Sequence, residues 1–182
     1  MQDVVKPATG RYKIDPVHSS INFGIRHVMV AKVRGGFKEF SGSGFFNAED
    51  VSKSELTVVI DAASIETGNP DRDKHLRSND FFAMEQFPEI RFGSTSFKEL
   101  GEGRYAVSGE LTMKGVTKPV TLELSYTGEA TDPYGNRRIG LEGSAVIDRT
   151  EWGVNYNAAL ESGGVLLGEK VSLEFDISAT AE

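Results

Sequence analysis

Three histidines are the residues of this chain best suited to metal or acid–base chemistry, and they stand far apart in the sequence. His18, His27 and His75 lack the close paired spacing of structural zinc motifs, and the chain contains no cysteine. The pair Asp71-x-Asp73 lacks the glycine and the distal glutamate of a calcium loop, and it suits the start of a helix. We therefore predict no metal site.

Nucleophilic catalysis would need a serine or similar group partnered by a base that a third residue holds in place. Serines are frequent, but no Gly-x-Ser-x-Gly motif occurs. The glycine-rich stretch Ser41–Gly44 lacks the lysine and the following helix of a phosphate-binding loop, and we interpret it as a bulge or bend in a strand. The sequence thus predicts no catalytic residue, no cofactor, and a protein that is not an enzyme.

His27 continues the phase of an alternating apolar segment. Ile21, Phe23 and Ile25 alternate with polar or small residues, so His27 should point with them toward the interior. Two interpretations stay open: a group that contacts the head of a bound ligand, or a histidine at the rim that a neighbour or water satisfies. His18 falls in the opposite phase, and we expect it to have a structural role.

Alternation of apolar and polar residues with a period of two recurs along the chain and predicts strands with one buried face. In the clearest case Tyr105, Val107, Leu111 and Met113 should face inward while Glu110 faces solvent. Short connections rich in glycine and proline indicate antiparallel neighbours. Eight strands are expected, around residues 21–25, 34–46, 56–62, 89–98, 105–113, 120–126, 139–147 and 171–178.

One segment departs from the strand period. Residues 70–86 begin like a helix, with Asn69 as the N-cap and Pro70 at the first helical position. The long connection 150–168 is typical of functional or disordered loops. The apolar residues behind the helix start are interpreted as a plug of one barrel end with partial ligand contact: Phe81, Phe82, Met84 and Phe87.

These strands fit either a sandwich or a closed barrel, and a barrel has the advantage that it leaves no exposed sheet edge. At eight strands the interior of a barrel is either filled by side chains or holds one small ligand. Periodicity alone does not choose between these two states.

Length and charge set further bounds. The chain has 182 residues and a formal net charge of -7, so a nucleic-acid partner is not expected. No apolar run reaches the length of a membrane-spanning helix, and we predict no transmembrane segment. The first residues show no basic region followed by an apolar stretch, which predicts a cytoplasmic protein, or a periplasmic or secreted one if a signal has been removed.

Three motifs resemble those of the YceI-like family. They are the segment from His18 to Phe23, with Asp15 before it and His27 after it; the segment from Arg72 to Phe82; and the segment from Leu111 to Val120. The resemblance spreads over most of the chain and implies one lipocalin-like, all-β domain over residues 1–182 that binds polyisoprenoids or other long-chain lipids. Lys114 replaces a histidine common in that family, and Trp152 stands where phenylalanine is common.

The sequence and the resemblance together predict an eight-stranded antiparallel lipocalin-like barrel that sequesters or carries a polyisoprenoid, an isoprenoid quinone or a similar lipid. A homodimer is compatible with this prediction. Alternatives are an interaction module with a filled lumen, linked to stress, and a lipid-modifying enzyme whose base is His27 or His75. In the barrel hypothesis His27 contacts the head group and Trp152 covers the mouth. The expected ligand-binding residues are Phe23, Ile25, His27, Val58, Ile60, Phe81, Phe82, Met84, Leu111, Met113, Leu122, Leu141, Trp152 and Phe175.

Overall fold

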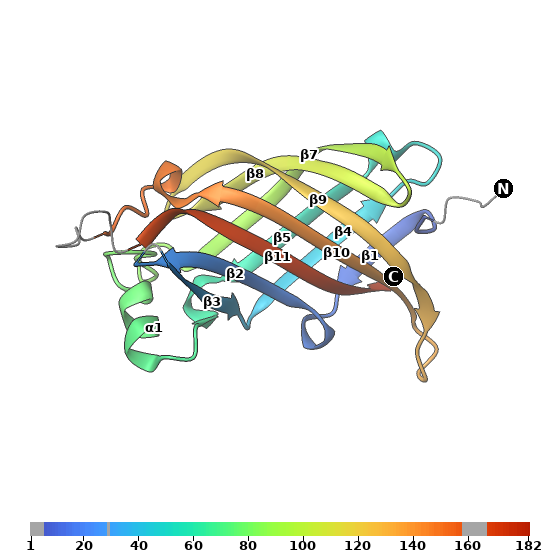
Figure 1. Ribbon diagram of the computed structural model, residues 1–182. Helices are drawn as coiled ribbons and strands as arrows, with labels where there is room; N and C mark the ends of the chain where they lie inside the picture. Colours follow the sequence, from blue (N-terminus) through green and yellow to red (C-terminus); the bar gives the residue numbers. More distant parts are fainter. Residues whose placement is uncertain (1–5, 29, 158–166) are drawn as a thin grey trace.

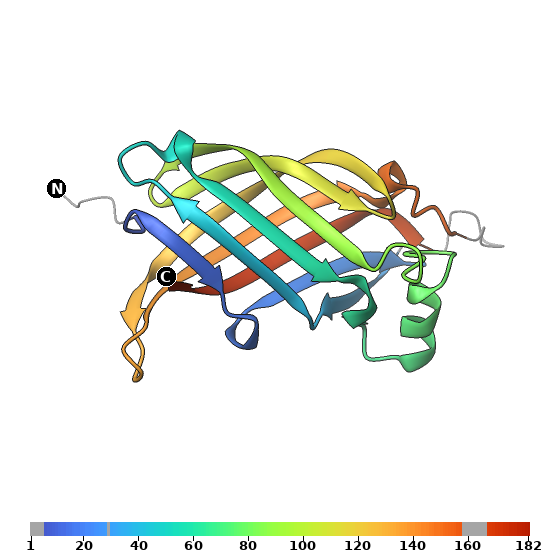
Figure 2. The ribbon, with the colours of Figure 1, turned by 180° about the vertical axis from the view of Figure 1, so that it is seen from behind.

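The computed structural model describes residues 6–28, 30–157 and 167–182. Within them, antiparallel strands hydrogen-bond side by side into a closed barrel (Figure 1 and, from behind, Figure 2). The closing pair joins β1 to β11, with Tyr12 opposite Ala181 and Ile14 opposite Ala179. The predicted eight-stranded barrel is confirmed. Its circuit runs through β1 (Gly10–Ile14), β4 (Phe40–Phe46), β5 (Glu55–Asp61), β7 (Glu89–Gly101), β8 (Arg104–Met113), β9 (Val116–Thr131), β10 (Arg137–Asp148) and β11 (Leu167–Ala181).

Three further strands extend the wall beyond the circuit: β2 (Ser20–His27), β3 (Ala31–Phe37) and β6 (Ile65–Glu66). β2 pairs with the first part of β11, whereas β1 pairs with its last residues, and the 3-10 helix η1 (Pro16–His18) separates β1 from β2. The expectation of one strand over 34–46 is wrong, because the chain leaves the sheet at Lys38 and Glu39 and divides it into β3 and β4. The five-residue β1 was not expected, because its alternation is too short to stand out.

The pleat of β8 agrees with the sequence pattern. Tyr105, Val107, Leu111 and Met113 are buried, and Glu110 is exposed. Gly109 occupies an inward position of the same strand. A Cβ there would lie 2.4 Å from the carbonyl oxygen of Gly93 and 2.6 Å from Cζ of Phe92, so the close approach of β7 requires glycine.

The stretch Ser41–Gly44 forms no bulge, contrary to the expectation, because β4 keeps a continuous register with β5 from Phe40 to Phe45. Its glycines serve close packing instead. A Cβ on Gly42 would lie 2.5 Å from Cδ1 of Ile14, and one on Gly44 would lie 2.7 Å from the carbonyl oxygen of Glu55. β4 therefore lies tightly between β1 and β5.

The helix α1 (Pro70–Arg77) lies across one end of the barrel (Figure 1). The side chain of Asn69 accepts a hydrogen bond from the backbone N–H of Arg72, so the predicted N-cap is confirmed. The helix ends at Arg77, earlier than the expected limit near 86, and turns follow it up to Phe87. It is too short and too polar to cross a bilayer, as are the other helices of the described residues. These are η1, η2 (Val51–Lys53), η3 (Ala62–Ser64) and η4 (Arg149–Trp152).

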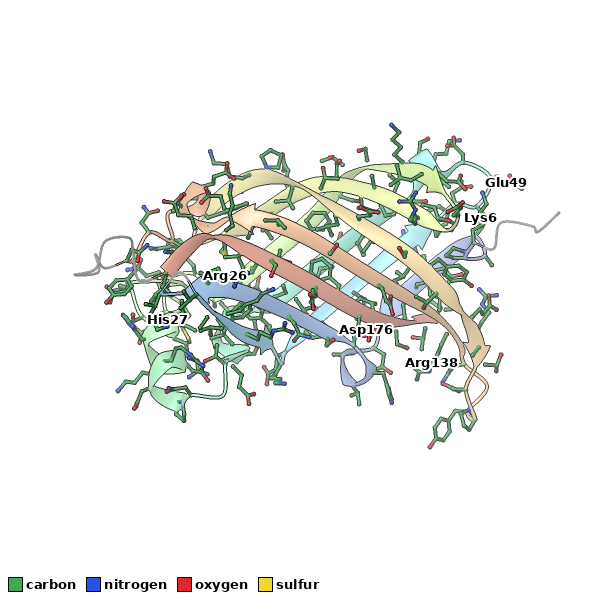
Figure 3. All side chains as sticks on the ribbon, in the orientation of Figure 1. Lys6, Arg26, His27, Glu49, Arg138 and Asp176 are labelled. Carbon is green, nitrogen blue, oxygen red and sulfur yellow. The ribbon has the colours of Figure 1, made fainter. Side chains whose placement is uncertain are left out.

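An ionic network braces the opposite end of the barrel, beside the β1–β11 closure. Figure 3 labels Arg138 at this end. Arg138 donates from Nη1 to Asp15 at 2.7 Å and from Nε to Asp132 at 2.8 Å. Nδ1 of His18 lies 2.8 Å from the same Asp15 carboxylate. The network joins η1 to the β9–β10 hairpin, which gives His18 the structural role expected of it.

This network predicts how stability depends on pH. Hydrogen bonds from His18 and Arg138 hold the pKa of Asp15 at about 2, and the Asn136 backbone N–H, with help from Arg138, holds the pKa of Asp132 at about 2. The unfolded chain takes up these protons near pH 3.8, so stability is complete above about pH 4 and falls as the pH drops toward about 2. We expect Arg138→Gln to flatten this fall in urea unfolding curves.

The matched control is Arg91→Gln, which removes an exposed arginine paired with Glu89 on the outer face of β7. It should keep the pH dependence of the parent. An Arg138→Gln protein that loses stability between pH 4 and pH 2 as steeply as the parent would contradict this assignment.

Candidate ligand-binding cavity

The barrel encloses an elongated cavity of about 590 Å³. It arises because each strand contributes every second side chain to the interior and these side chains do not fill it. The volume lies within the range of small-molecule sites, about 300–1,000 Å³. Most of the lining is apolar and comes from β2, β5, β7, β8, β9, β10 and β11, for example Phe23, Val58, Phe92, Leu111, Leu122, Leu141 and Phe175.

Nearly all residues predicted from the sequence to bind a ligand lie on this lining. Their contact with a ligand stays a prediction, but the fold brings them to one surface. Phe81 and Phe82, from the turns behind α1, line the helix end of the cavity, whereas Phe87, the third aromatic residue of the expected plug, does not line it. The residues on the lining are Phe23, Ile25, His27, Val58, Ile60, Phe81, Phe82, Leu111, Met113, Leu122, Leu141 and Phe175.

Trp152 and Met84 are the two exceptions. Trp152 is 1% exposed and donates from Nε1 to the carbonyl oxygen of Leu111 at 2.9 Å, so it does not cover a mouth but fixes η4 against β8. Its size and single donor suit a buried anchor, which the sequence pattern did not distinguish from a lid. Met84 packs against the core beside the cavity without lining it.

Lys114 also lies outside the lining. It follows Met113 in the tight β8–β9 turn with a φ of 52°, and Nζ donates to the carbonyl oxygen of Gly153 at 3.1 Å. Lys114 therefore ties the β8–β9 turn to Gly153, the residue that ends η4.

Polar side chains gather at the helix end of the cavity, where Figure 3 places His27. Arg72 donates from Nε and Nη2 to the side chain and carbonyl of Thr67, both at 2.7 Å. Nε2 of His75 lies 2.7 Å from the Asp80 carboxylate. The His75 ring packs edgewise against Phe81 and Tyr156. His75 therefore lies on the cavity lining as part of an aromatic cluster with Phe81 and Tyr156.

Arg149 is the functional candidate that sequence reasoning missed. It is 4% exposed and lines the cavity, and burial lowers its pKa. Nε donates to the carbonyl oxygen of Gly168 at 2.9 Å and Nη1 to that of Val154 at 2.6 Å. Nη2 is buried and has no hydrogen-bond partner in the described part of the chain. A signal was present, because Arg149 continues the inward phase of Ile147 in β10.

The opposite end of the cavity carries tyrosines. The hydroxyl of Tyr12 donates to the carbonyl oxygen of Ala8 at 2.6 Å. The hydroxyl of Tyr105 is buried without a partner among the described residues, and burial raises its pKa. Its ring packs edgewise on Phe46, with centroids 5.5 Å apart. This end offers a neutral hydroxyl where the helix end offers a cation.

No cluster of three or more histidines, aspartates or glutamates suited to a metal ion occurs in residues 6–28, 30–157 and 167–182. Of the three histidines, His27 and His75 lie on the cavity, while His18 lies on the outside at the other end. The fold therefore separates one of the three from the others.

Comparison with known proteins gives concordant matches. A family model described as the YceI-like domain matches residues 12–179. A UPF0312 protein of Staphylococcus epidermidis is 39% identical over 165 residues, which cover 90% of this chain and 94% of that protein. A UPF0312 protein of Photorhabdus laumondii is 42% identical over 151 residues, which cover 82% and 77%.

Solved structures share the fold at lower identity. BcnA of Burkholderia cenocepacia aligns with a TM-score of 0.80 and 21% identity, over 91% of this chain and 98% of that one. A polyisoprenoid-binding domain from Saccharophagus degradans aligns with a TM-score of 0.70 and 18% identity, over 94% and 98%. At these identities the likeness shows the barrel alone.

The role of Trp152 is open to a direct test. Trp152→Ala removes a fully buried ring and should lower the free energy of unfolding by about 3–5 kcal/mol. Trp152→Phe keeps most of the ring but loses the hydrogen bond to the Leu111 carbonyl, at a cost of about 0.5–1.5 kcal/mol. Tyr134→Ala, at a side chain that is 88% exposed, should change stability by less than about 0.5 kcal/mol. Urea unfolding followed by far-ultraviolet circular dichroism measures all three, and equal stability of Trp152→Ala and Tyr134→Ala would refute the anchor.

Proposed function

The chain belongs to the YceI-like family, and from that membership we propose that it binds one long-chain lipid inside its barrel. The proposed ligand has an isoprenoid-type tail, as in a polyisoprenoid or an isoprenoid quinone, and the protein sequesters or carries it. The observation that carries the proposal is the 590 Å³ cavity, which runs between the two barrel ends with an apolar middle. The polyisoprenoid-binding domain from Saccharophagus degradans, which shares this fold, supports the same ligand class.

Burial of the tail would drive binding. Each Å² of apolar surface removed from water contributes about 25 cal/mol, so a tail that hides ~300 Å² gains roughly 7 kcal/mol before the cost of association. The lining combines aromatic rings such as Phe23 and Phe175 with branched side chains such as Val58, Ile60 and Leu122. Such a surface suits a branched hydrocarbon chain by shape and offers its middle no polar partner.

The alternative of a module with a filled lumen accounts poorly for this cavity. A protein that only presents its surface gains nothing from unfilled interior space, since each void forfeits packing contacts. A cytoplasmic location and a homodimer stay predictions from the sequence.

One observation favours the enzyme alternative. His75 lines the cavity and has an acidic partner in Asp80, which is the pairing that a catalytic base would need. Both side chains are substantially exposed, however, and no hydroxyl is hydrogen-bonded to the imidazole ring of His75 in the described residues; the Ser78 hydroxyl donates to its backbone carbonyl instead. We therefore assign the pair to the structure of the helix end.

The carrier proposal predicts that filling the lumen displaces lipid. Val58→Trp places an indole in the middle of the cavity, so lipid that co-purifies with the protein should fall by roughly tenfold or more in native mass spectrometry. Stability should change by less than about 1 kcal/mol, which corresponds to about 2–4 °C in Tm. In a filled core the same change would cost about 1–3 kcal/mol.

Two variants control this experiment. Leu122→Trp repeats the test from β9, and Thr57→Trp places the same side chain on the outer face of β5, next to Val58. Thr57→Trp should keep the lipid. A parent protein that never carries lipid, together with inward variants that melt far lower, would favour the filled module.

The proposal also predicts no turnover of ester, phosphate or glycoside probes above the buffer rate. His75→Gln and Asp80→Asn should leave that rate unchanged. An activity that His75→Gln abolishes at constant Tm would instead establish the enzyme.

A further inference from the structure

A cation without a counterion faces the cavity at its helix end. Arg149 is 4% exposed, and in the part of the chain that the structure describes no carboxylate forms an ion pair with it within 4.0 Å. We propose that Arg149 binds the head group of the ligand and selects lipids with an anionic oxygen, either a carboxylate or a phosphate. This inference rests on the proposed function, because it assigns the polar part of the same ligand.

The guanidinium is held in place before any ligand arrives. The carbonyl oxygens of Gly168 and Val154 accept from Nε and Nη1, which fixes the plane of the group between β11 and the chain behind η4. Among the residues that the structure describes, the hydrogens of Nη2 then find no acceptor, although this atom is buried. Buried polar groups are nearly always satisfied, and an unsatisfied charged one carries a large desolvation penalty. A ligand oxygen at Nη2 would remove that penalty.

The nearest acidic residues are engaged elsewhere or exposed. The Asp148 carboxylate accepts from the hydroxyl and backbone N–H of Thr150 and lies 3.6 Å from Nζ of Lys170. Glu169, near the start of β11, is exposed. Both lie close enough to favour the charged form of Arg149, yet neither supplies the missing hydrogen bond. We infer that a ligand inside the cavity supplies the acceptor.

The other polar groups at this end also suit an anion. Gly168, which holds Arg149, follows Leu167, and Leu167 pairs with His27 in the sheet. Tyr156 lies two residues beyond Val154, the second anchor of Arg149. Among the described residues, Asp71 is the one carboxylate on the cavity lining at this end, and it is exposed. The end as a whole therefore favours negative over positive head groups.

A charged oxygen fits better than a neutral one. Hydrogen bonds between ionised partners are roughly twice as strong as those between neutral groups. An alcohol can accept from Nη2 but leaves the buried positive charge uncompensated. A carboxylate or phosphate supplies both the acceptor and the charge.

The test compares three probes with one tail: geranylgeraniol, geranylgeranoic acid and geranylgeranyl phosphate. Calorimetric titration of the lipid-free protein at pH 7.5 gives the Kd of each. We expect the acid or the phosphate to bind about 10- to 100-fold more tightly than the alcohol. The tighter of the two anions identifies the carboxylate or the phosphate as the source of the oxygen.

Arg149→Met should abolish this preference and leave the Kd of the alcohol within about threefold, since the tail site is untouched. Arg149→Lys keeps the positive charge but not the planar set of N–H donors of the guanidinium, so it should retain part of the preference for anions. Lys114→Met is the matched control. It removes a basic side chain that is hydrogen-bonded to the same segment but does not line the cavity. It should bind like the parent.

The outcomes separate the two proposals. If the parent binds none of the three probes, the proposed function fails. If the parent binds the alcohol as tightly as both anions, or if a folded Arg149→Met protein keeps the preference, the head-group assignment fails and the carrier stands. Should circular dichroism show Arg149→Met to be unfolded, the ratio of anion to alcohol affinity in the parent decides the matter.

Discussion

The architecture depends on one constraint, the closure of the sheet by β1. This short strand pairs with β4 along one side and with the end of β11 along the other, so it joins the two ends of the eight-strand circuit. Closure forces the inward side chains of every strand to converge on a common axis. All of them must then be apolar or find polar partners within the barrel. The apolar wall and the enclosed cavity follow from this geometry together.

The apolar residues of the barrel fall into two groups: some pack tightly and hold segments together, and others line the cavity. Trp152, Ile65 and Val107 are fully buried and hold segments together, whereas side chains such as Phe23 and Val58 stay partly accessible along the lumen. A uniform apolar lumen attracts any tail of suitable girth and discriminates little. Discrimination has to come from the ends, where Arg149 and Tyr105 offer unmatched donors of different charge.

Much of this arrangement could be predicted because side chains of a strand alternate between its two faces, so the burial of each face appears in the sequence as alternating apolar and polar residues. The inward set of β8 and the placement of His27 on the lumen followed from alternation alone. The break between β3 and β4 did not, because glycines blur the apolar pattern there and serve close strand packing instead. Alternation likewise cannot tell an anchor from a lid, so Trp152 was placed at a mouth. Arg149 was missed since its charge argues against burial, although its position in the phase of β10 argues for it.

The β1–β11 closure also determines when the barrel can close during synthesis of the chain. Lys13 and Thr180 meet across it, and 167 residues separate them. At the usual 5–20 residues per second, a ribosome needs about 8 to 33 seconds to deliver the second partner after the first. β4 becomes available to β1 much earlier. For most of that time the other edge of β1 is therefore unpaired, and the apolar inner face of the sheet is open to solvent. The same hydrophobic surface that later lines the closed cavity is then the surface most in need of protection by a chaperone.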